Sequence, residues 1–397
     1  MFNLSRKWMT IVLAVWAIKL ILVPLPPLTA DFLSWVSGSQ QIFNLLISGK
    51  LPSVGTFGVY IALQILLTPF YWLWTLLPIQ HLTLAEMVVH PSLARYSLMY
   101  VMKIPIIVCD FLTGLLAFNL VGRLNTSRAR KAFLSWHLNP FNWYWLYWFT
   151  TMDIVAAVIV LLAVQYGINR KWSYCGMCLS LATILRLYPI LLVPFFVVYA
   201  LWVERQAPTR ALVHFASAFV VPIFVGMVFQ GFVSGSFAAV VNTLLQFPAT
   251  QPELPDILGF HLASLFTLTP FLLVLQLYVS FWRWKKNTAL VLLVLAPLLV
   301  FFASGTSFGL HFIWASALLS IYYALDNDLL LFSLAFLSGF LSPITTGPLF
   351  THYFGWDLTY QGGQPVIDLL GPCMSGVHYG TKITYLLKLN LSRLRGS

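Results

Sequence analysis

The sequence predicts an all-α protein built as a bundle of membrane-spanning helices. Of its 397 residues, 60% are hydrophobic and 8% are charged, whereas soluble domains carry about 25% charged residues. Because a water-soluble fold of this size could not bury so much apolar surface, the surrounding solvent must largely be lipid. The formal net charge of +11 could suggest a nucleic acid partner, but we predict none, because no soluble basic domain exists to bind it.

Long apolar runs mark about twelve candidate spans, although several are shorter than the ~20 residues that cross a bilayer upright. The short neighbouring runs 173–187 and 189–202 are predicted to be half-helices or a hairpin, because Pro189 and Pro194 in the second run favour a break there. The runs lie at 9–24, 101–121, 132–150, 153–168, 173–187, 189–202, 211–230, 262–281, 288–304, 309–325, 329–350 and 366–388.

The basic residues lie in short clusters between the apolar runs, which is the pattern of cytoplasmic loops in membrane proteins. The clusters all fall on one side only if the apolar stretch 58–78 is not counted as a crossing. We therefore predict that 58–78 is a re-entrant or interfacial helix and that both termini are cytoplasmic. The clusters are Arg6/Lys7, Arg123/Arg128/Arg130/Lys131, Arg170/Lys171, Arg205/Arg210, Arg283/Lys285/Lys286 and Lys388/Arg393/Arg395.

This topology predicts one transmembrane domain over residues 1–397, without a separate soluble domain. Its first external loop covers about 25–100 and carries the re-entrant or juxtamembrane helices. Residues 34–47 are expected to lie on the membrane surface, with Trp35 and Ile42 among the side chains that face lipid. The chain is thus expected to be a multi-pass membrane protein.

Several ionisable residues lie within or beside the apolar runs. Charged groups at such depth are costly, and they usually face the bundle interior or a wet cavity. By the predicted topology, five of them lie toward the outer half of the membrane, which predicts a functional site there. The five are Asp31, Lys103, Asp153, Arg186 and His311.

Each of these groups has a functional and a structural interpretation. Asp31 follows the first span and could accept a proton as a general base, or it could cap a helix. Arg186 lies in an apolar hairpin and needs an anion, either a phosphate or the carboxylate of Asp153 or Asp110. Asp153 could instead favour the dipole of the helix that it opens, and Asp110 could be a buried acid paired with a neighbouring helix.

No cofactor is predicted, and binding of a divalent metal ion is left as an alternative. The eight histidines are scattered without metal-ligand spacing. Neither a Walker loop nor a dinucleotide-binding glycine motif is present. Cys175 and Cys178 form a C-x-x-C inside an apolar segment, where helix packing explains them better than redox chemistry.

Residues 103–194 resemble the GT-C class of polytopic glycosyltransferases. The nearest likeness is to the mannosyltransferase of glycosylphosphatidylinositol synthesis and its prokaryotic relatives. A weaker likeness extends to most of the chain through ISGKLPS and LHFIWAS. The pieces that carry the central resemblance are KIPIIVCDFLTGLL, RLNTSRARKAFLSWHLNP, TTMDIVAAVIVL and ILRLYPILLVP, in this order.

The resemblance implies an active site in the first extracytoplasmic loop and an inverting transfer from a dolichyl- or polyprenyl-phosphate-linked sugar. The acid just after the first span, here Asp31, is then the catalytic base. Arg186 stands where relatives carry lysine before the Tyr-Pro pair, and with Lys103 and His311 it is expected to bind the donor phosphate. Structural or substrate-positioning roles fall to Asp110, Asp153 and Tyr188.

Besides Arg186 in place of lysine, the chain departs from the family pattern at three further places. Relatives often carry D-x-D where this chain has Thr29-Ala30-Asp31, so a single carboxylate stands where a metal-binding pair could be. His311-Phe312 replaces a family Gln-Tyr, which could alter contacts to donor or acceptor. Thr151-Met152 replaces the Gly-Asn that precedes the family aspartate.

We therefore expect an enzyme that moves mannose or another hexose from a lipid-phosphate donor to a glycolipid, glycan or protein acceptor. It would act on the non-cytoplasmic face of the plasma membrane in a prokaryote or of the endoplasmic reticulum in a eukaryote. One alternative is a transporter or lipid-linked glycan translocase, in which Asp110, Asp153 and Arg186 line the path. Another is a non-catalytic membrane subunit that binds a lipid or a partner protein.

Overall fold

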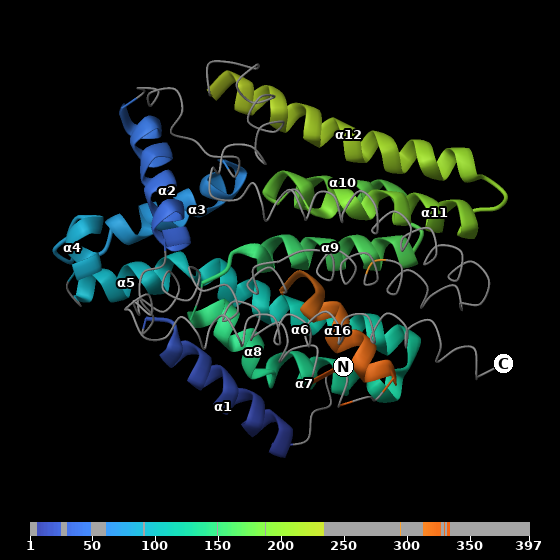
Figure 1. Cartoon of the computed structure of the whole chain (residues 1–397), viewed down its shortest axis with the longest axis horizontal. Coiled ribbons are helices and arrows are strands. Elements are labelled where there is room, and N and C mark those ends of the chain that lie inside the picture. The colour runs from blue at the N-terminus through green and yellow to red at the C-terminus, as the bar shows by residue number, and fades with distance from the viewer. Residues whose placement is uncertain are drawn as a thin grey trace, which may run out of the picture.

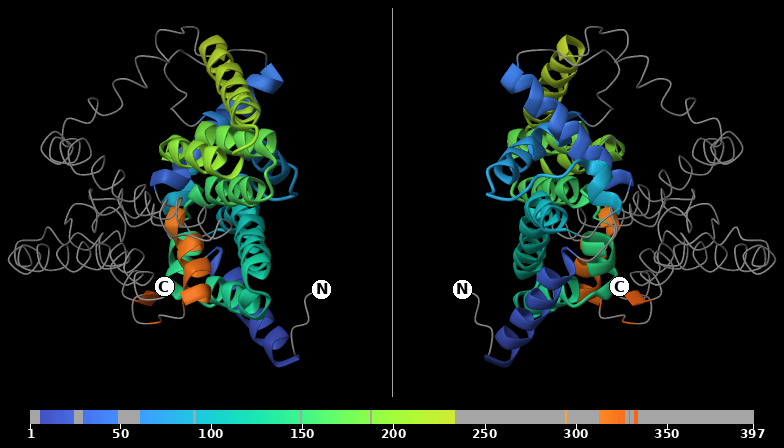
Figure 2. Two further views of the ribbon diagram at one scale, coloured as in Figure 1. Left: turned by 90° about the vertical axis from the view of Figure 1, so that its right-hand side faces the viewer. Right: turned by 90° about the vertical axis from the view of Figure 1, so that its left-hand side faces the viewer.

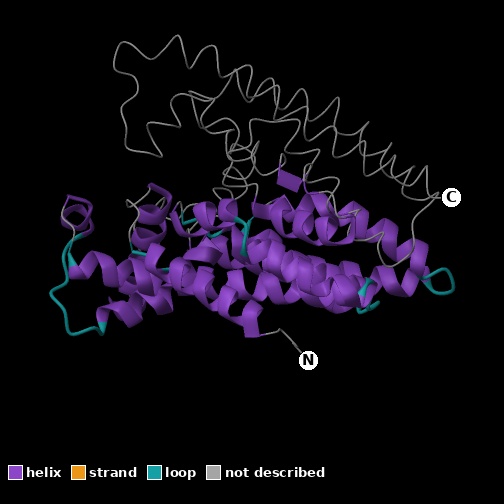
Figure 3. Cartoon of the chain, turned by 90° about the horizontal axis from the view of Figure 1, so that it is seen from below, coloured by secondary structure: helices purple, strands orange, loops and turns teal. Residues whose placement is uncertain are grey.

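The computed structural model describes residues 6–24, 30–48, 61–89, 92–148, 150–186, 188–233 and 313–326, together with 294, 329, 332 and 333. Every ordered element in this part of the chain is a helix (Figure 3), which confirms the predicted helical class there. Two helical stretches, Leu93–Leu124 and Pro208–Gly226, are long and apolar enough to cross a membrane. The figure of about twelve spans stays a prediction.

The helices divide into an N-terminal group and a central group. The first group contains α1 (Arg6–Leu22), α2 (Ala30–Ser48), α3 (Ile61–Thr75), α4 (Leu84–Val89) and α5 (Leu93–Met102). The second contains α6 (Ile104–Leu124), η1 (Thr126–Arg128), α7 (Ala129–His137), α8 (Pro140–Trp143), the π-helical η2 (Tyr144–Trp148), α9 (Asp153–Ile168), α10 (Trp172–Leu185), η3 (Tyr188–Leu192), α11 (Val193–Val203), α12 (Pro208–Val233) and α16 (Ile313–Asp326).

The central helices are stacked between two outer helices. Figures 1 and 2 place α12 at one edge and α1 at the opposite edge, with α10, α9 and α6 between them. α10 packs on both α9 and α12, and α16 packs on α6, α7 and α9. The group α2–α5 lies at the end of the stack where α6 begins (Figure 1).

Several helices begin at side chains that satisfy the first free backbone N–H groups. Before α4, Thr83 Oγ1 accepts from the Glu86 N–H at 3.3 Å, and the Glu86 carboxylate accepts from the Thr83 N–H at 2.7 Å. This reciprocal pair is a capping box. Ser92 Oγ accepts from the Arg95 N–H at 3.2 Å and begins α5 in the same way. Local sequence thus determines where these short helices start.

The segment 34–47 is helical, and its predicted orientation is wrong at Trp35 and Ile42; Leu46 in the same segment is 72% exposed, as the prediction requires. Trp35 and Ile42 are buried rather than turned to lipid, because α2 packs along α3, with the rings of Phe43 and Tyr71 5.7 Å apart. In the described part of the stretch 58–78, which begins at residue 61, the helix is α3 with 15 residues, shorter than an upright span.

The predicted span 132–150 is not one helix. α7 ends at His137, and Pro140 begins α8, because the residue before a proline is disfavoured in helical conformation. The predicted break between 173–187 and 189–202 is present: α10 ends at Leu185, and a short 3-10 helix precedes α11.

The outer helices expose apolar side chains. Val220, Val221, Phe224 and Val225 of α12 are each more than half exposed, at 57 to 62%. Such a continuous apolar face requires an apolar solvent or a partner. It agrees with the composition, which indicates lipid around the chain.

Candidate functional site

Arg186 stands at the break between α10 and η3, with an extended backbone. Its Nε lies 2.5 Å from Oδ1 of Asp153, and both side chains are buried. Asp153 is the first residue of α9, where the helix dipole also favours a negative charge. The predicted alternative of an ion pair between these two residues is therefore confirmed.

The carboxylate of Asp153 is held from a second side by the last helix that the structure describes. Trp314 in α16 donates from Nε1 to Oδ2 of Asp153 at 2.8 Å. The Trp314 ring also stacks on Tyr188, with centroids 3.6 Å apart and an interplanar angle of 9°. One buried acid thus joins the start of α9, the break after α10 and the start of α16.

Trp35 completes this group from α2. The guanidinium carbon of Arg186 lies 5.9 Å from the centre of the Trp35 ring, within the range of a cation–π contact. We call Trp35, Asp153, Arg186, Tyr188 and Trp314 the Arg186 cluster. Four segments that are distant in sequence therefore meet at one place.

Two further predicted residues stand next to the Arg186 cluster in the chain. Asp31 is in α2, four residues and hence about one turn before Trp35; its side chain lies outside the described residues. His311 also lies outside them, three positions before Trp314. The described backbone thus places α2, the helix that contains Asp31, beside Arg186.

A second buried polar group surrounds Asp110 in α6. Its carboxylate accepts from Lys19 Nζ at 2.7 Å, from Tyr147 Oη at 2.8 Å and from Trp136 Nε1 at 2.7 Å. Lys19 also lies 3.3 Å from Nδ1 of His137. We call these five residues the Asp110 cluster. The predicted structural role of Asp110, paired with a neighbouring helix, agrees with these contacts.

Lys103 is buried but contacts no carboxylate among the described residues. Its ammonium group donates to the carbonyl oxygen of Val23 at 2.8 Å and to that of Tyr147 at 2.9 Å. These bonds join the end of α1 and the end of η2 to the junction of α5 and α6. The contacts give Lys103 a structural role and do not bring it to the Arg186 cluster.

Several partners of the buried charged residues were not predicted from the sequence. Lys19, His137 and Tyr147 were not singled out, although Lys19 is a lone charge inside the first apolar run and predicts a buried acid near it. Trp35 and Trp314 were missed because an apolar aromatic residue gives no sign of whether it faces lipid or a buried charge.

The two ends of the bundle differ in charge. The Arg186 cluster lies where α9 and α16 begin, whereas the basic residues Arg123 and Arg170 lie where α6 and α9 end. With 16 residues in α9, about 24 Å separates the ends, somewhat less than the ~30 Å apolar thickness of a bilayer. The described residues contain no group of three or more His, Cys, Asp or Glu that could hold a metal ion.

No protein-family model, no curated protein and no solved structure matches this chain.

Proposed function

We propose that the chain is a polytopic membrane glycosyltransferase of the GT-C kind. It transfers mannose or another hexose from a lipid-phosphate donor to a glycolipid, glycan or protein acceptor, and Asp31 is its general base. The supporting observation is the contact between Arg186 and Trp35, because it brings a buried guanidinium to the helix that carries Asp31. About twelve spans and an extracytoplasmic site belong to the same proposal.

The reaction needs a base on one side of the sugar and an anion-binding group on the other. Asp31 takes the proton of the acceptor hydroxyl, whose oxygen forms the new bond to the anomeric carbon with inversion. The bond from that carbon to the phosphate oxygen breaks, and the lipid phosphate leaves with the electron pair. A guanidinium stabilises this departing charge and has five N–H donors in a planar fork.

Asp153 orients Arg186 in this mechanism. It meets the guanidinium through Nε and is itself fixed by Trp314. The stacked Tyr188 and Trp314 rings then form one wall of the site. His311, three residues before Trp314, is proposed as a further donor-phosphate contact.

A translocase or transporter is the second candidate, and the Asp110 cluster favours it. Buried ionisable groups inside a membrane bundle commonly line substrate or proton paths. The cluster holds a lysine, an aspartate and a histidine with little exposure. Movement of an intact lipid-linked sugar across a vesicle, without a new glycosidic bond, would favour this candidate over the enzyme.

The first test measures sugar transfer by Asp31→Asn. Purified protein in vesicles receives a radiolabelled polyprenyl-phosphate mannose and a membrane glycolipid extract. The variant should lose at least about 10²-fold in turnover, because an amide cannot take the proton, and donor binding should persist. Glu204→Gln is the matched control, since Glu204 ends α11 at the basic end of the bundle. Full turnover by Asp31→Asn would remove the proposed base.

The second test separates phosphate stabilisation from charge pairing at Arg186. Arg186→Gln should lower the rate by about 10²-fold, as when an oxyanion contact is lost, but it also leaves Asp153 buried without its partner. The double variant Arg186→Gln/Asp153→Asn removes both charges and should stay inactive while it folds. Activity restored in the double variant would reduce Arg186 to a counter-ion of Asp153.

A further inference from the structure

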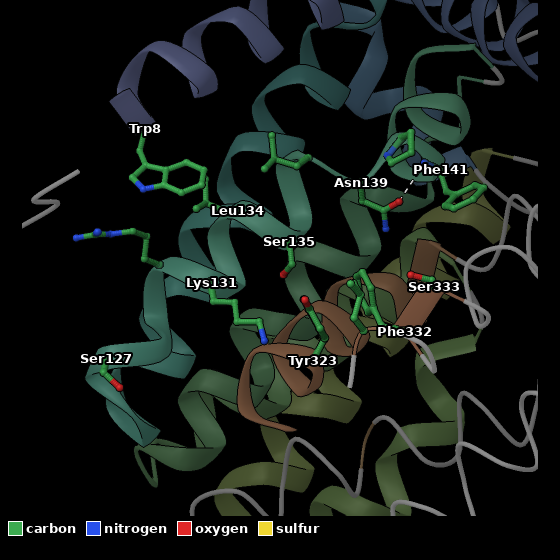
Figure 4. Close-up of a pocket in the computed structure, with 14 residues that line it drawn as sticks. Trp8, Ser127, Lys131, Leu134, Ser135, Asn139, Phe141, Tyr323, Phe332 and Ser333 are labelled. Atoms are coloured by element: carbon green, nitrogen blue, oxygen red, sulfur yellow. Dashed lines mark hydrogen bonds between the residues drawn. The ribbon is translucent and has the colours of Figure 1, made fainter. Parts of the chain in front are cut away.

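A pocket of about 730 Å³ opens at the basic end of the bundle. Trp8 of α1, the basic turn of η1 and α7, and Tyr323 of α16 contribute to its lining. Ser135 projects between α7 and α16 (Figure 4). The pocket is separate from the Arg186 cluster, which lies where α16 begins rather than where it ends.

The lining of this pocket is amphipathic. Arg130 and Lys131 supply positive charge, and none of the described lining residues is acidic. Lys131 Nζ lies 3.9 Å from the centre of the Tyr323 ring, and Figure 4 shows the lysine pointing toward that ring. The apolar part of the lining includes Trp8 and Leu134. A ligand that fits this pocket therefore needs both a negatively charged group and an apolar part.

The position of the pocket identifies the source of such a ligand. The pocket joins elements that carry the clusters Arg6/Lys7 and Arg123–Lys131, both of which the predicted topology places at the cytoplasmic surface. Arg123 donates to Asn169, which ties the end of α6 to the turn after α9. Anionic lipids are concentrated in the cytoplasmic leaflet, and basic pockets between membrane helices bind their head groups.

We propose that this pocket binds an anionic glycerophospholipid of the surrounding membrane. The head-group phosphate meets Arg130 and Lys131, and the first part of an acyl chain lies against Trp8 and Leu134. A volume of about 730 Å³ is in the range of sites that enclose a small ligand, so it holds a head group and adjoining methylenes while the rest of the chains stay in the bilayer. This site is independent of the proposed transferase reaction.

The test measures lipid retained by the full chain in native mass spectrometry after purification from vesicles with equal phosphatidylglycerol and phosphatidylcholine. The protein should retain one phosphatidylglycerol in preference to phosphatidylcholine. Arg130→Gln/Lys131→Gln should weaken this retention about tenfold or more, since each basic residue near the surface contributes about 1 kcal/mol to binding of anionic lipid. Arg123→Gln/Arg205→Gln removes the same charge outside the pocket lining and should leave retention unchanged.

A second variant tests the apolar part of the pocket. Leu134→Trp fills the space without a change of charge and should displace the lipid while the protein stays folded. Equal retention of phosphatidylglycerol by all variants would indicate only a non-specific lipid layer and would overturn the proposal. Competition by glycerol phosphate as strong as by the whole lipid would indicate a simple phosphate site. Preference for polyprenyl phosphate would assign the pocket to the donor; either result would overturn the proposal.

Discussion

At the scale of single residues, two buried carboxylates in the described part of the chain each face a buried cation. Asp110 has Lys19 as its partner at 2.7 Å, and Arg186 has Asp153 at 2.5 Å. Burying one charge without a partner in lipid-like surroundings is far more costly than burying a pair. The pairs therefore fix how α1 packs against α6 and how the break after α10 packs against α9, since any other register would separate the partners.

The Asp110 pair gives a stability prediction. Lys19→Met should lower the free energy of unfolding by about 3 kcal/mol, because it leaves the Asp110 carboxylate buried and uncompensated. The double variant Lys19→Met/Asp110→Leu should recover part of this loss. Thermal unfolding in a mild detergent measures both. Lys171→Met, at an exposed lysine, is the control, and simple additivity of the two single changes would contradict the pairing.

At the scale of elements, breaks in the helices place the site residues. Arg186 has its extended backbone because α10 stops at Leu185, and Asp153 opens α9 after a turn in which Thr150 has φ 62. A β-branched residue rarely adopts this left-handed conformation. Such strained backbone persists only where the surroundings hold it, and it clusters near functional sites. The irregular segments thus determine the positions of the site residues more than the regular helices do.

The turn after α9 gives a prediction about an element boundary. Arg170 has φ 58 just past the C-cap of α9, a position that favours glycine. Arg170→Gly should raise the free energy of unfolding by up to about 1 kcal/mol, because glycine adopts this φ without steric cost. The change also removes a 3.8 Å contact with Glu204, which contributes little because the Arg170 side chain is 55% exposed. Chemical unfolding in detergent measures the change. Arg170→Ala keeps the strained φ and should not be stabilising; equal gains in both variants would refute the argument.

At the scale of the whole molecule, the sequence predicted the helical class and the break before Pro189, because composition and proline act locally. An ion pair of Arg186 with Asp153 was one of the three alternatives predicted, beside Asp110 and a phosphate. The sequence could not give the partner of Asp110, since Lys19 is 91 positions away and no local pattern encodes that distance. Trp35 was misplaced because lipid and protein interior attract the same apolar side chains.

Topology is testable at the same scale. Cysteine introduced at exposed Ser127 should react with a membrane-impermeant maleimide only after the inner face is opened, because it lies in the basic turn. Cysteine at exposed Gln80, in the turn before α4, should react from outside. Both changes are made in a variant without the four native cysteines. Labelling of both positions from the same face would contradict the predicted orientation.

The ion pair at Arg186 has a consequence for the resting enzyme that we propose. Between turnovers the guanidinium already holds the Asp153 carboxylate, so this pair carries no net charge. The donor phosphodiester brings one negative charge, and after Asp31 has taken the proton of the acceptor hydroxyl the lipid phosphate leaves as a monoester with two. Asp153, which orients Arg186, thereby also weakens the binding of Arg186 to the lipid phosphate product and favours product release.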